Sequence, residues 1–248
     1  MHLPETVREI LRKLETAGFQ AYAVGGCVRD SILGKVPDDW DLTTDARPEE
    51  VKALFPRTVD TGLQHGTVTV LLGREGYEVT TYRIDGAYSD GRHPDSISFT
   101  PSLAEDLRRR DFTINAMAVS EQGEIVDLFD GREDLRRGCI RCVGDAHERF
   151  REDALRMLRA VRFAAQLNFD IDPESFAAIA ELAENLKRVS KERILAELTK
   201  LLLSDHPEKS ELLYESGLAP QMAAHFPGLH ADRRPETNQT GSAESRER

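Results

Sequence analysis

Hydrophobic and polar residues follow two different periods in the first part of the chain. Between residues 4 and 18, apolar residues recur every three or four positions, which predicts an amphipathic helix. Strict alternation at residues 67–72 and 77–83, on either side of a glycine-bounded turn, predicts a β-hairpin. Short apolar runs predict further strands at residues 19–24, 39–43, 125–129 and 139–143. Two short helices are expected at residues 28–33 and 48–55.

The pattern changes near residue 146, beyond which only helical periods occur. Helices are predicted at residues 146–167, 173–186, 191–203 and 209–216. We therefore expect an α+β chain, with a head at residues 1–145 built on a small mixed sheet and an all-helical neck at 146–230. Residues 231–248 form a polar tail that we expect to be disordered. The polar segment 85–98 is expected to be a loop that can move.

Charge and composition narrow the class of protein. The 248 residues carry 33 basic and 44 acidic side chains, a net charge of −11, which by itself argues against nucleic-acid binding. Residues 132–162 depart from this average, because they contain nine arginines, no lysine and six acids. No apolar run is long enough to span a membrane, and the N-terminus does not resemble a secretory signal. Three cysteines are too few for a disulfide scaffold, so we expect a cytoplasmic protein. Cys139 and Cys142 are read as strand residues, with half of a metal site as the alternative.

Two carboxylates follow a glycine turn early in the chain. Gly25-Gly26 lies between a predicted strand and helix, where a phosphate can approach the backbone, and Arg29 can bind a phosphate through two hydrogen bonds. On a strand, Asp39 and Asp41 would project to the same side, where they repel each other unless a cation lies between them. Oxygen ligands of this kind suit Mg²⁺, and Glu78 on a later strand can supply a third carboxylate.

Five motifs, in order, resemble those of a known enzyme family. They are Gly25-Gly26-x-x-Arg29-Asp30-x-x-x-Gly34 with Asp39-x-Asp41, Arg109-Arg110-Asp111-Phe112-Thr113-Ile114-Asn115-Ala116, Asp130-Gly131-x-x-Asp134-Leu135, Glu152-Asp153-Ala154-Leu155-Arg156, and Ser190-x-Glu192-Arg193 with Glu197-Leu198. They look like motifs A to E of the class II CCA-adding tRNA nucleotidyltransferase and bacterial poly(A) polymerase family, in the polymerase β-like superfamily. The resemblance covers roughly residues 19–229.

The resemblance implies a role for each motif. Asp39 and Asp41 would hold two Mg²⁺ ions about 4 Å apart, with Glu78 as a third acidic position. Gly26 and Arg29 would contact the phosphates of the nucleotide. The ribose and triphosphate would be bound by Arg110, Asp111 and Asn115. Arg159 and Arg162, further along the helix of the fourth motif, could reach the triphosphate or RNA; a solvated helix face is the alternative for these two.

The fourth motif suggests how a base is chosen without a template. Asp153 and Arg156 are three residues apart and would share one face of a helix. Cytosine and adenine both present an amino donor beside a ring-nitrogen acceptor, which a carboxylate and a guanidinium match. Uracil and guanine present the reverse order, so the pair would select C and A. A matched pair of this kind discriminates by about 1–3 kcal/mol per base.

These residues predict a template-independent nucleotidyltransferase that uses CTP and ATP to complete CCA at the 3′ end of tRNA. A CC-only enzyme, an A-only enzyme and a poly(A) polymerase share the motifs and stay open as alternatives. Members of the family usually continue into further helical domains that grip tRNA, whereas this chain ends soon after the predicted neck. A C-terminally shortened, non-catalytic RNA-binding remnant is therefore the alternative from another class. The sequence leaves the oligomeric state open, including a homo-oligomer or a partner chain that supplies the missing body.

Overall fold

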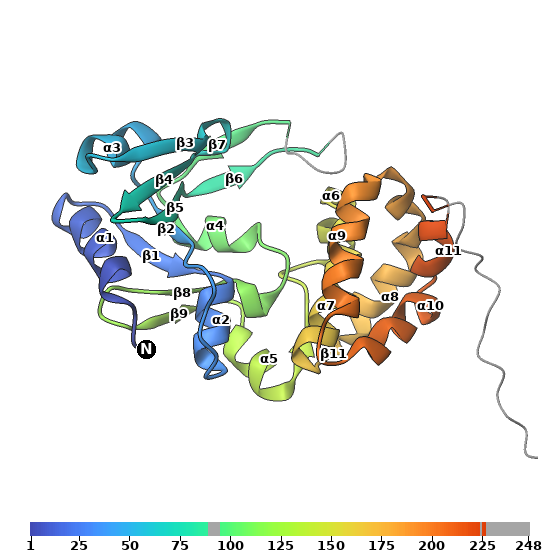
Figure 1. Cartoon of the computed structure of the whole chain (residues 1–248). Coiled ribbons are helices and arrows are strands. Elements are labelled where there is room, and N and C mark those ends of the chain that lie inside the picture. Colours follow the sequence, from blue (N-terminus) through green and yellow to red (C-terminus); the bar gives the residue numbers. More distant parts are fainter. Residues whose placement is uncertain (89–94, 224, 227–248) are drawn as a thin grey trace, which may run out of the picture.

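A mixed sheet of seven strands forms the centre of the head (Figure 1). The computed structural model describes residues 1–88, 95–223 and 225–226. The strand order is β3-β4-β5-β2-β1-β8-β9, and neighbours are antiparallel except β2 and β5, which are parallel. The strands are β1 Ala21–Val24, β2 Leu42–Thr44, β3 Thr58–Gly62, β4 Thr67–Leu72, β5 Glu75–Thr81, β8 Met117–Val119 and β9 Ile125–Asp127. The predicted mixed sheet is confirmed.

Short helices and two small ladders complete the head. The helices are α1 Glu5–Thr16, α2 Gly26–Ile32, α3 Pro48–Leu54, α4 Leu103–Arg108 and α5 Gly131–Arg137, with single 3-10 turns η1 Leu63–His65 and η2 Thr113–Asn115. Helix α1 forms as predicted, because its apolar residues all face the core and are fully buried. Strands β6 Arg83–Asp85 and β7 Ile97–Phe99 pair antiparallel, and β10 Cys139–Ile140 pairs parallel with β11 Asp170–Ile171.

The neck is built from helices that lie to one side of the sheet in Figure 1. They are α6 Ala146–Glu152, α7 Leu155–Leu167, α8 Pro173–Leu182, η3 Ala183–Arg188, α9 Lys191–Leu202, η4 Pro207–Glu211, α10 Leu212–Glu215 and α11 Leu218–Ala223. The predicted α+β head followed by a helical neck is confirmed. One buried apolar cluster extends from α1 through the sheet to α11, so the two parts share a core. The boundary predicted at residue 145 stays a prediction.

Two predicted elements differ from the structure near the site. The helix expected at residues 146–167 is two helices, because Asp153 is extended (φ −144°, ψ 104°) and its carboxylate accepts a hydrogen bond from the N–H of Leu155. The strand expected at 39–43 begins only at Leu42. Its neighbour β1 ends at Val24, before the glycine turn, so residues 39 and 40 have no β1 residue to pair with, and the pairing of β2 with β5 also begins only at Leu42.

Other differences concern elements that the periodicity does not indicate. Strands β3 and β8 and helices α4, α5 and α11 were not predicted. The expected loop at 85–98 has ordered ends, since β6 and β7 pair there; its residues 89–94 lie outside the described residues. The expected disordered tail at 231–248 also lies outside them.

Candidate active site

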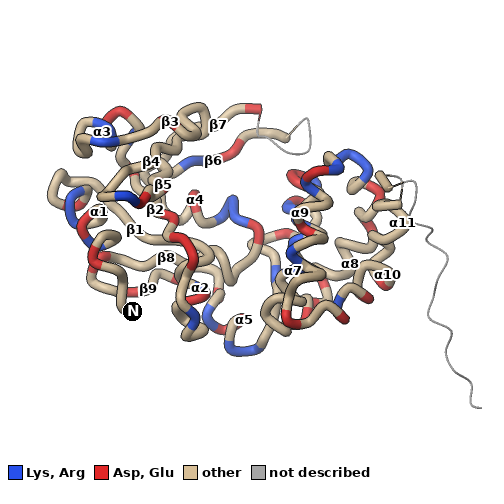
Figure 2. The backbone as a smooth tube through the Cα atoms, in the orientation of Figure 1, with Lys and Arg blue, Asp and Glu red and all other residues tan. Residues whose placement is uncertain are grey.

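A cleft of about 540 Å³ lies where the sheet meets the neck. It collects all the predicted site residues except Glu78, and it draws them from segments more than 100 residues apart. Its lining is Gly25, Gly26, Arg29, Asp39, Asp41, Arg109, Arg110, Asp111, Asn115, Asp153, Leu155, Arg156, Arg159, Arg162, Phe163 and Arg193. Figure 2 shows basic segments of α7 and α9 on the side turned toward the sheet. The cleft therefore combines carboxylates on the head with arginines from both parts.

The glycine turn brings backbone close to an arginine. Gly25 has φ +87°, which disfavours any residue with a side chain, and a Cβ placed there would lie 3.3 Å from Nη1 of Arg110. The N–H of Gly25 donates to the carbonyl of Met117 on β8, so the turn is tied to the sheet. A side chain at position 25 would be strained by this backbone conformation and would crowd the guanidinium of Arg110.

Asp39 and Asp41 lie in the extended segment that leads into β2. The carbonyl of Asp41 accepts a hydrogen bond from the N–H of Val24 (2.9 Å), which anchors this segment to the end of β1. The parallel register pairs Leu42 with Val79, so Glu78 lies on the strand next to Asp41. Glu78 does not line the cleft itself.

The electrostatics of Asp41 show a concentration of negative charge. Burial raises the pKa of the Asp41 carboxyl, repulsion from Asp39 and Glu78 adds to this, and Arg110 opposes it. Within the described residues, neither Asp39 nor Asp41 forms an ion pair. Ionised carboxylates left in this state are expected to favour a cation between them.

This donor set fits a magnesium-type ion. Among the described residues, no three His, Cys, Asp or Glu side chains gather as a complete metal cage. Mg²⁺ is usually bound by only one or two carboxylates, with water and substrate phosphates as the other ligands. Asp39 and Asp41 match that incomplete set, beside an arginine-lined space for the phosphates.

Every arginine in the cleft has a carboxylate partner. The pairs, by their nearest nitrogen–oxygen distances, are Arg29–Asp30 at 2.8 Å, Arg109–Asp106 at 2.8 Å, Arg110–Asp106 at 3.4 Å, Arg156–Glu152 at 2.5 Å, Arg159–Asp111 at 2.5 Å, Arg162–Glu197 at 2.5 Å and Arg193–Asp153 at 2.7 Å. These acids fix the arginines in place from the protein side. The longest of the contacts is that of Arg110, whose buried Nε also has no partner among the described residues.

Asp111 connects the head to the neck. Its Oδ2 accepts hydrogen bonds from Nε (2.8 Å) and Nη2 (2.5 Å) of Arg159 on α7, and its Oδ1 accepts from the side chain of Asn115. Burial would raise the pKa of Asp111, but Arg159 and Arg156, with the hydrogen bonds from Arg159 and Asn115, hold it well below its usual range. Asp111 is therefore ionised and holds Arg159 at the edge of the cleft.

Asp153 and Arg156 both line the cleft, but they do not lie on one continuous helix. Asp153 stands in the break between α6 and α7, and both of its oxygens accept hydrogen bonds from Arg193 on α9. Arg156 is in the first turn of α7 and donates to Glu152 and to the carbonyl of Arg109. The two side chains thus face the same space while each is held by its own partners.

Comparison with known proteins decides the family. The family model of the poly A polymerase head domain matches residues 21–141, and that of the probable RNA and SrmB-binding site of polymerase A matches residues 168–232. The chain is 53% identical to the CCA-adding enzyme of Leuconostoc mesenteroides over 90% of its own length and 55% of the relative's. It is 56% identical to that of Levilactobacillus brevis over 84% and 53%. The chain belongs to the tRNA nucleotidyltransferase and poly(A) polymerase family.

Solved members of the nucleotidyltransferase family share this fold. The CCA-adding enzyme of Bacillus stearothermophilus, in a complex with CTP, superposes with a TM-score of 0.83 at 45% identity, over 91% of this chain and 55% of that one. The CCA-adding enzyme of Thermotoga maritima, complexed with tRNA, gives 0.73 at 26% identity, over 88% and 51%. The chain thus spans about half the length of the relatives that it matches. The family resemblance predicted from the motifs is confirmed.

Five residues that line the cleft were not among the predicted site residues: Gly25, Arg109, Leu155, Phe163 and Arg193. Arg109 and Arg193 belong to quoted motifs, so their motif membership was an available signal. Phe163 has no such signal, because an aromatic residue at helical spacing is typical of a core.

None of the described helices is long and apolar enough to cross a membrane. Cys139 lies on β10, as predicted, whereas Cys142 lies beyond the end of that strand; both are free thiols.

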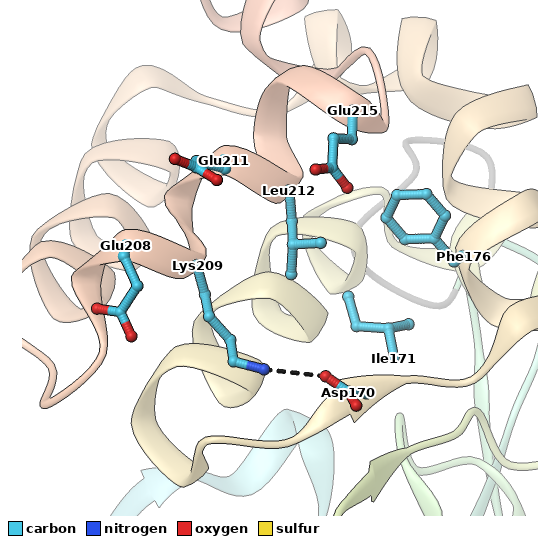
Figure 3. A pocket seen from close by; sticks show the side chains of 8 residues that line it. All are labelled: Asp170, Ile171, Phe176, Glu208, Lys209, Glu211, Leu212 and Glu215. Carbon is cyan, nitrogen blue, oxygen red and sulfur yellow. Dashed lines mark hydrogen bonds and ion pairs between the residues drawn. The ribbon is translucent and has the colours of Figure 1, made fainter.

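A second hollow, within the neck, differs in its chemistry (Figure 3). It is lined by Ile171, Phe176 and Leu212 together with four acids and Lys209. The ammonium of Lys209 is already held by Asp170 (3.0 Å) and by the carbonyl of Phe169 (2.8 Å). A hollow rich in carboxylates repels phosphates, so the cleft at the sheet is the better candidate for a nucleotide.

Proposed function

We propose that this protein is a template-independent nucleotidyltransferase that adds CMP and AMP to the 3′ end of tRNA and completes CCA. The observation that carries the proposal is the cleft itself, where two carboxylates that form no ion pair with any described residue lie beside prearranged arginines. The CCA-adding enzymes to which the chain is similar support the same reaction. We assign catalysis to residues 1–145, and base recognition and RNA binding to residues 146–230.

Asp39 and Asp41 would hold the divalent cation, with Glu78 as a further negative charge next to Asp41. These residues would hold Mg²⁺, which when bound would supply Lewis-acid chemistry for attack by the RNA 3′-hydroxyl and for departure of pyrophosphate. In this reaction the α-phosphorus would form a bond to the 3′-oxygen and break its bond to the oxygen of the leaving pyrophosphate, while the proton of the 3′-hydroxyl would pass to solvent. Asp39 and Asp41 contribute the fixed negative charge, and the arginines stabilise the charge on the departing group.

The nucleotide phosphates are assigned to the arginine side of the cleft. Arg110 is the first candidate, because within the described part of the chain its Nε has no acceptor and its one ion pair, with Asp106, is long. Gly26 has no side chain, so its backbone can be approached from the cleft. Arg29 and Arg159 line the same side of the cleft as Arg110. Asn115 joins Asp111 to Arg29, since its amide donates to one and its carbonyl accepts from the other. Arg162 also lines the cleft, where it is largely buried and held by Glu197 and Gln166.

Asp153 and Arg156 are proposed to read the Watson–Crick edge of C or A. Both border the cleft, and each is fixed by a neighbour, Arg193 for Asp153 and Glu152 for Arg156. Such fixation limits the side chains to one donor and acceptor arrangement, as template-free selection requires. A matched contact of this kind favours the correct base over a wrong one by about 1–3 kcal/mol.

A direct incorporation assay tests the proposal. The full chain is incubated with Mg²⁺ and tRNA that lacks its CCA end, with each nucleoside triphosphate alone and with CTP and ATP together. We expect CTP alone to add the CC dinucleotide, ATP to be used only after CC, and UTP and GTP to be rejected.

Each rival gives a different product in this assay. A ladder of A residues indicates a poly(A) polymerase, and products that end at CC or that need a CC primer indicate CC-only or A-only addition. Retention of tRNA on a filter without any incorporation indicates an RNA-binding remnant and contradicts the proposal. The cytoplasm and a possible second copy of the chain stay predictions of the sequence.

A further inference from the structure

Phe163 occupies an unusual position for a core residue. It lies on α7, is 5% exposed, and lines the cleft. Three guanidinium groups surround its ring, with Cζ to centroid distances of 3.8 Å for Arg162, 5.1 Å for Arg29 and 5.3 Å for Arg159. All three lie within the distance at which a cation is attracted by an aromatic ring.

The ring also bridges the head and the neck. Phe163 packs edge to face against Phe112, with centroids 5.8 Å apart and an interplanar angle of 83°. Phe112 is fully buried in the head and directly precedes η2, which carries Asn115. Asn115 in turn accepts a hydrogen bond of 2.7 Å from Arg29. Phe163, on the helix that begins at the end of the fourth motif, therefore contacts residues of the first two motifs, Arg29 and Phe112.

The positive charges of three arginines around one ring repel one another unless negative groups balance them. Each arginine has a carboxylate of its own, Asp30 for Arg29, Asp111 for Arg159 and Glu197 for Arg162. A carboxylate fixes where a guanidinium is held, but the long side chain can still rotate around that contact. The negative face of an aromatic ring supplies a second point of attraction without adding a hydrogen-bond acceptor that would compete with a phosphate.

Arg162 holds the ring of Phe163, the second point of attraction, in a fixed position. It is the nearest of the three to the ring, and it is itself buried and bound by Glu197 and Gln166. Burial lowers the pKa of Arg162, and Glu197 opposes that shift. The hydrogen bonds to Glu197 and Gln166 hold the guanidinium in place. It therefore fixes the ring of Phe163, which contacts the two arginines that lie nearer the head.

We propose that Phe163 is a positioning residue for the triphosphate: its ring orients Arg29 and Arg159 together, across the junction of head and neck. The proposal rests on the proposed function, because it concerns the same nucleotide cleft. It assigns Phe163 an effect on the phosphates and none on the base, which is read by Asp153 and Arg156. A phenylalanine that only filled the core would affect both parts of the nucleotide alike.

The test compares equilibrium binding of CTP and of cytidine, without tRNA, in the full chain and its variants. Phe163→Leu keeps an apolar side chain but removes the ring, and Phe163→Tyr keeps the ring. Phe150→Leu is the matched control, since Phe150 is also buried in the neck, on α6, and no guanidinium of the described residues lies over its ring. Thermal unfolding of all three variants measures their loss of stability.

We expect Phe163→Leu to weaken CTP binding about tenfold while cytidine binding stays unchanged, as loss of contacts to two cations implies. Phe163→Tyr should restore most of the CTP affinity, and Phe150→Leu should leave both affinities near wild type despite a similar loss of stability. Equal weakening of CTP and cytidine, or unchanged CTP binding, would overturn the positioning role. A wild-type chain that binds no CTP would instead overturn the proposed function itself.

Discussion

The two sides of the cleft differ in whether their charged side chains have partners of opposite charge. On the arginine side every cation has an acidic partner, such as Asp111 for Arg159 at 2.5 Å. On the carboxylate side Asp39 and Asp41 have no ion-pair partner among the described residues, and the pKa of Asp41 is raised by burial and by repulsion. The arginines are thus prearranged by the fold, whereas the carboxylates are left with an excess of charge that a divalent ion and its substrate would balance.

This difference indicates which ionised side chains oppose folding and which ones stabilise the folded state. A folded-state pKa above the unfolded value means that ionisation of Asp41 opposes folding, so its contribution to stability falls as pH rises. Asp111 has the opposite sign, because its pKa is lowered in the folded state. Substitutions on the two sides should therefore separate activity from stability.

The largest effect is expected from the carboxylate side. Asp39→Asn and Asp41→Asn should each reduce nucleotide incorporation at least about 100-fold, because they remove a ligand of the proposed cation. Asp41→Asn should not lower the unfolding temperature at neutral pH, since it removes a repulsive charge. Incorporation into tRNA and thermal unfolding are measured on the same preparations. Full activity in either variant would contradict the assignment of the cation site.

On the arginine side the main effect should be on stability. Asp111→Asn should lower the free energy of unfolding by about 3 kcal/mol, because it leaves Arg159 without its buried partner. The contribution of Asp111 is present above its unfolded pKa of about 4 and is lost as pH falls through the lower folded value. Chemical denaturation of both proteins across this range should show their difference shrinking toward acid pH. A constant difference would indicate that the charge of Asp111 is not what stabilises the junction.

Asp153 should give an intermediate effect that is confined to base choice. Asp153→Ala removes the carboxylate that Arg193 holds, and with it one half of the proposed edge contact. Discrimination between CTP and UTP should fall about tenfold or more. Competition between the two triphosphates in one incorporation assay measures this ratio. An unchanged ratio would show that the base is read elsewhere.

The smallest effect is expected at a surface ion pair. Glu133 on α5 pairs with Arg136 and Arg137, and those hydrogen bonds and charges lower its pKa to about 2, yet all three groups lie at the surface. Glu133→Gln should leave incorporation and nucleotide selectivity at wild-type values. It serves as the control for the other variants, because it changes charge without touching the cleft. A substantial loss of activity would show that charge anywhere on α5 matters.

Much of the site was predictable from sequence because its residues occur in short motifs. The glycine turn, the two aspartates and the arginine-rich segments were all identified before their arrangement was known, and eleven of the twelve predicted residues line one cleft. Helix α1 and the β4–β5 hairpin were predictable because their periodicity is strict.

The remaining features depend on contacts between distant segments. The break at Asp153 contains no proline or glycine; it is stabilised by Arg193, which lies 40 residues further along the chain. Likewise Asp41 lies just before β2 rather than within it, because the pairing with β1 ends near the glycine turn. Phe163 resembles any core aromatic residue until three arginines are seen around its ring. Local patterns cannot specify such partners.

The most direct test is the position of a metal ion and a nucleotide in a crystal of the protein grown with Mn²⁺ and CTP. The account predicts anomalous scattering from manganese between Asp39 and Asp41, with the triphosphate extending along Arg110 and Arg29. Manganese elsewhere, or a triphosphate bound away from this cleft, would contradict it.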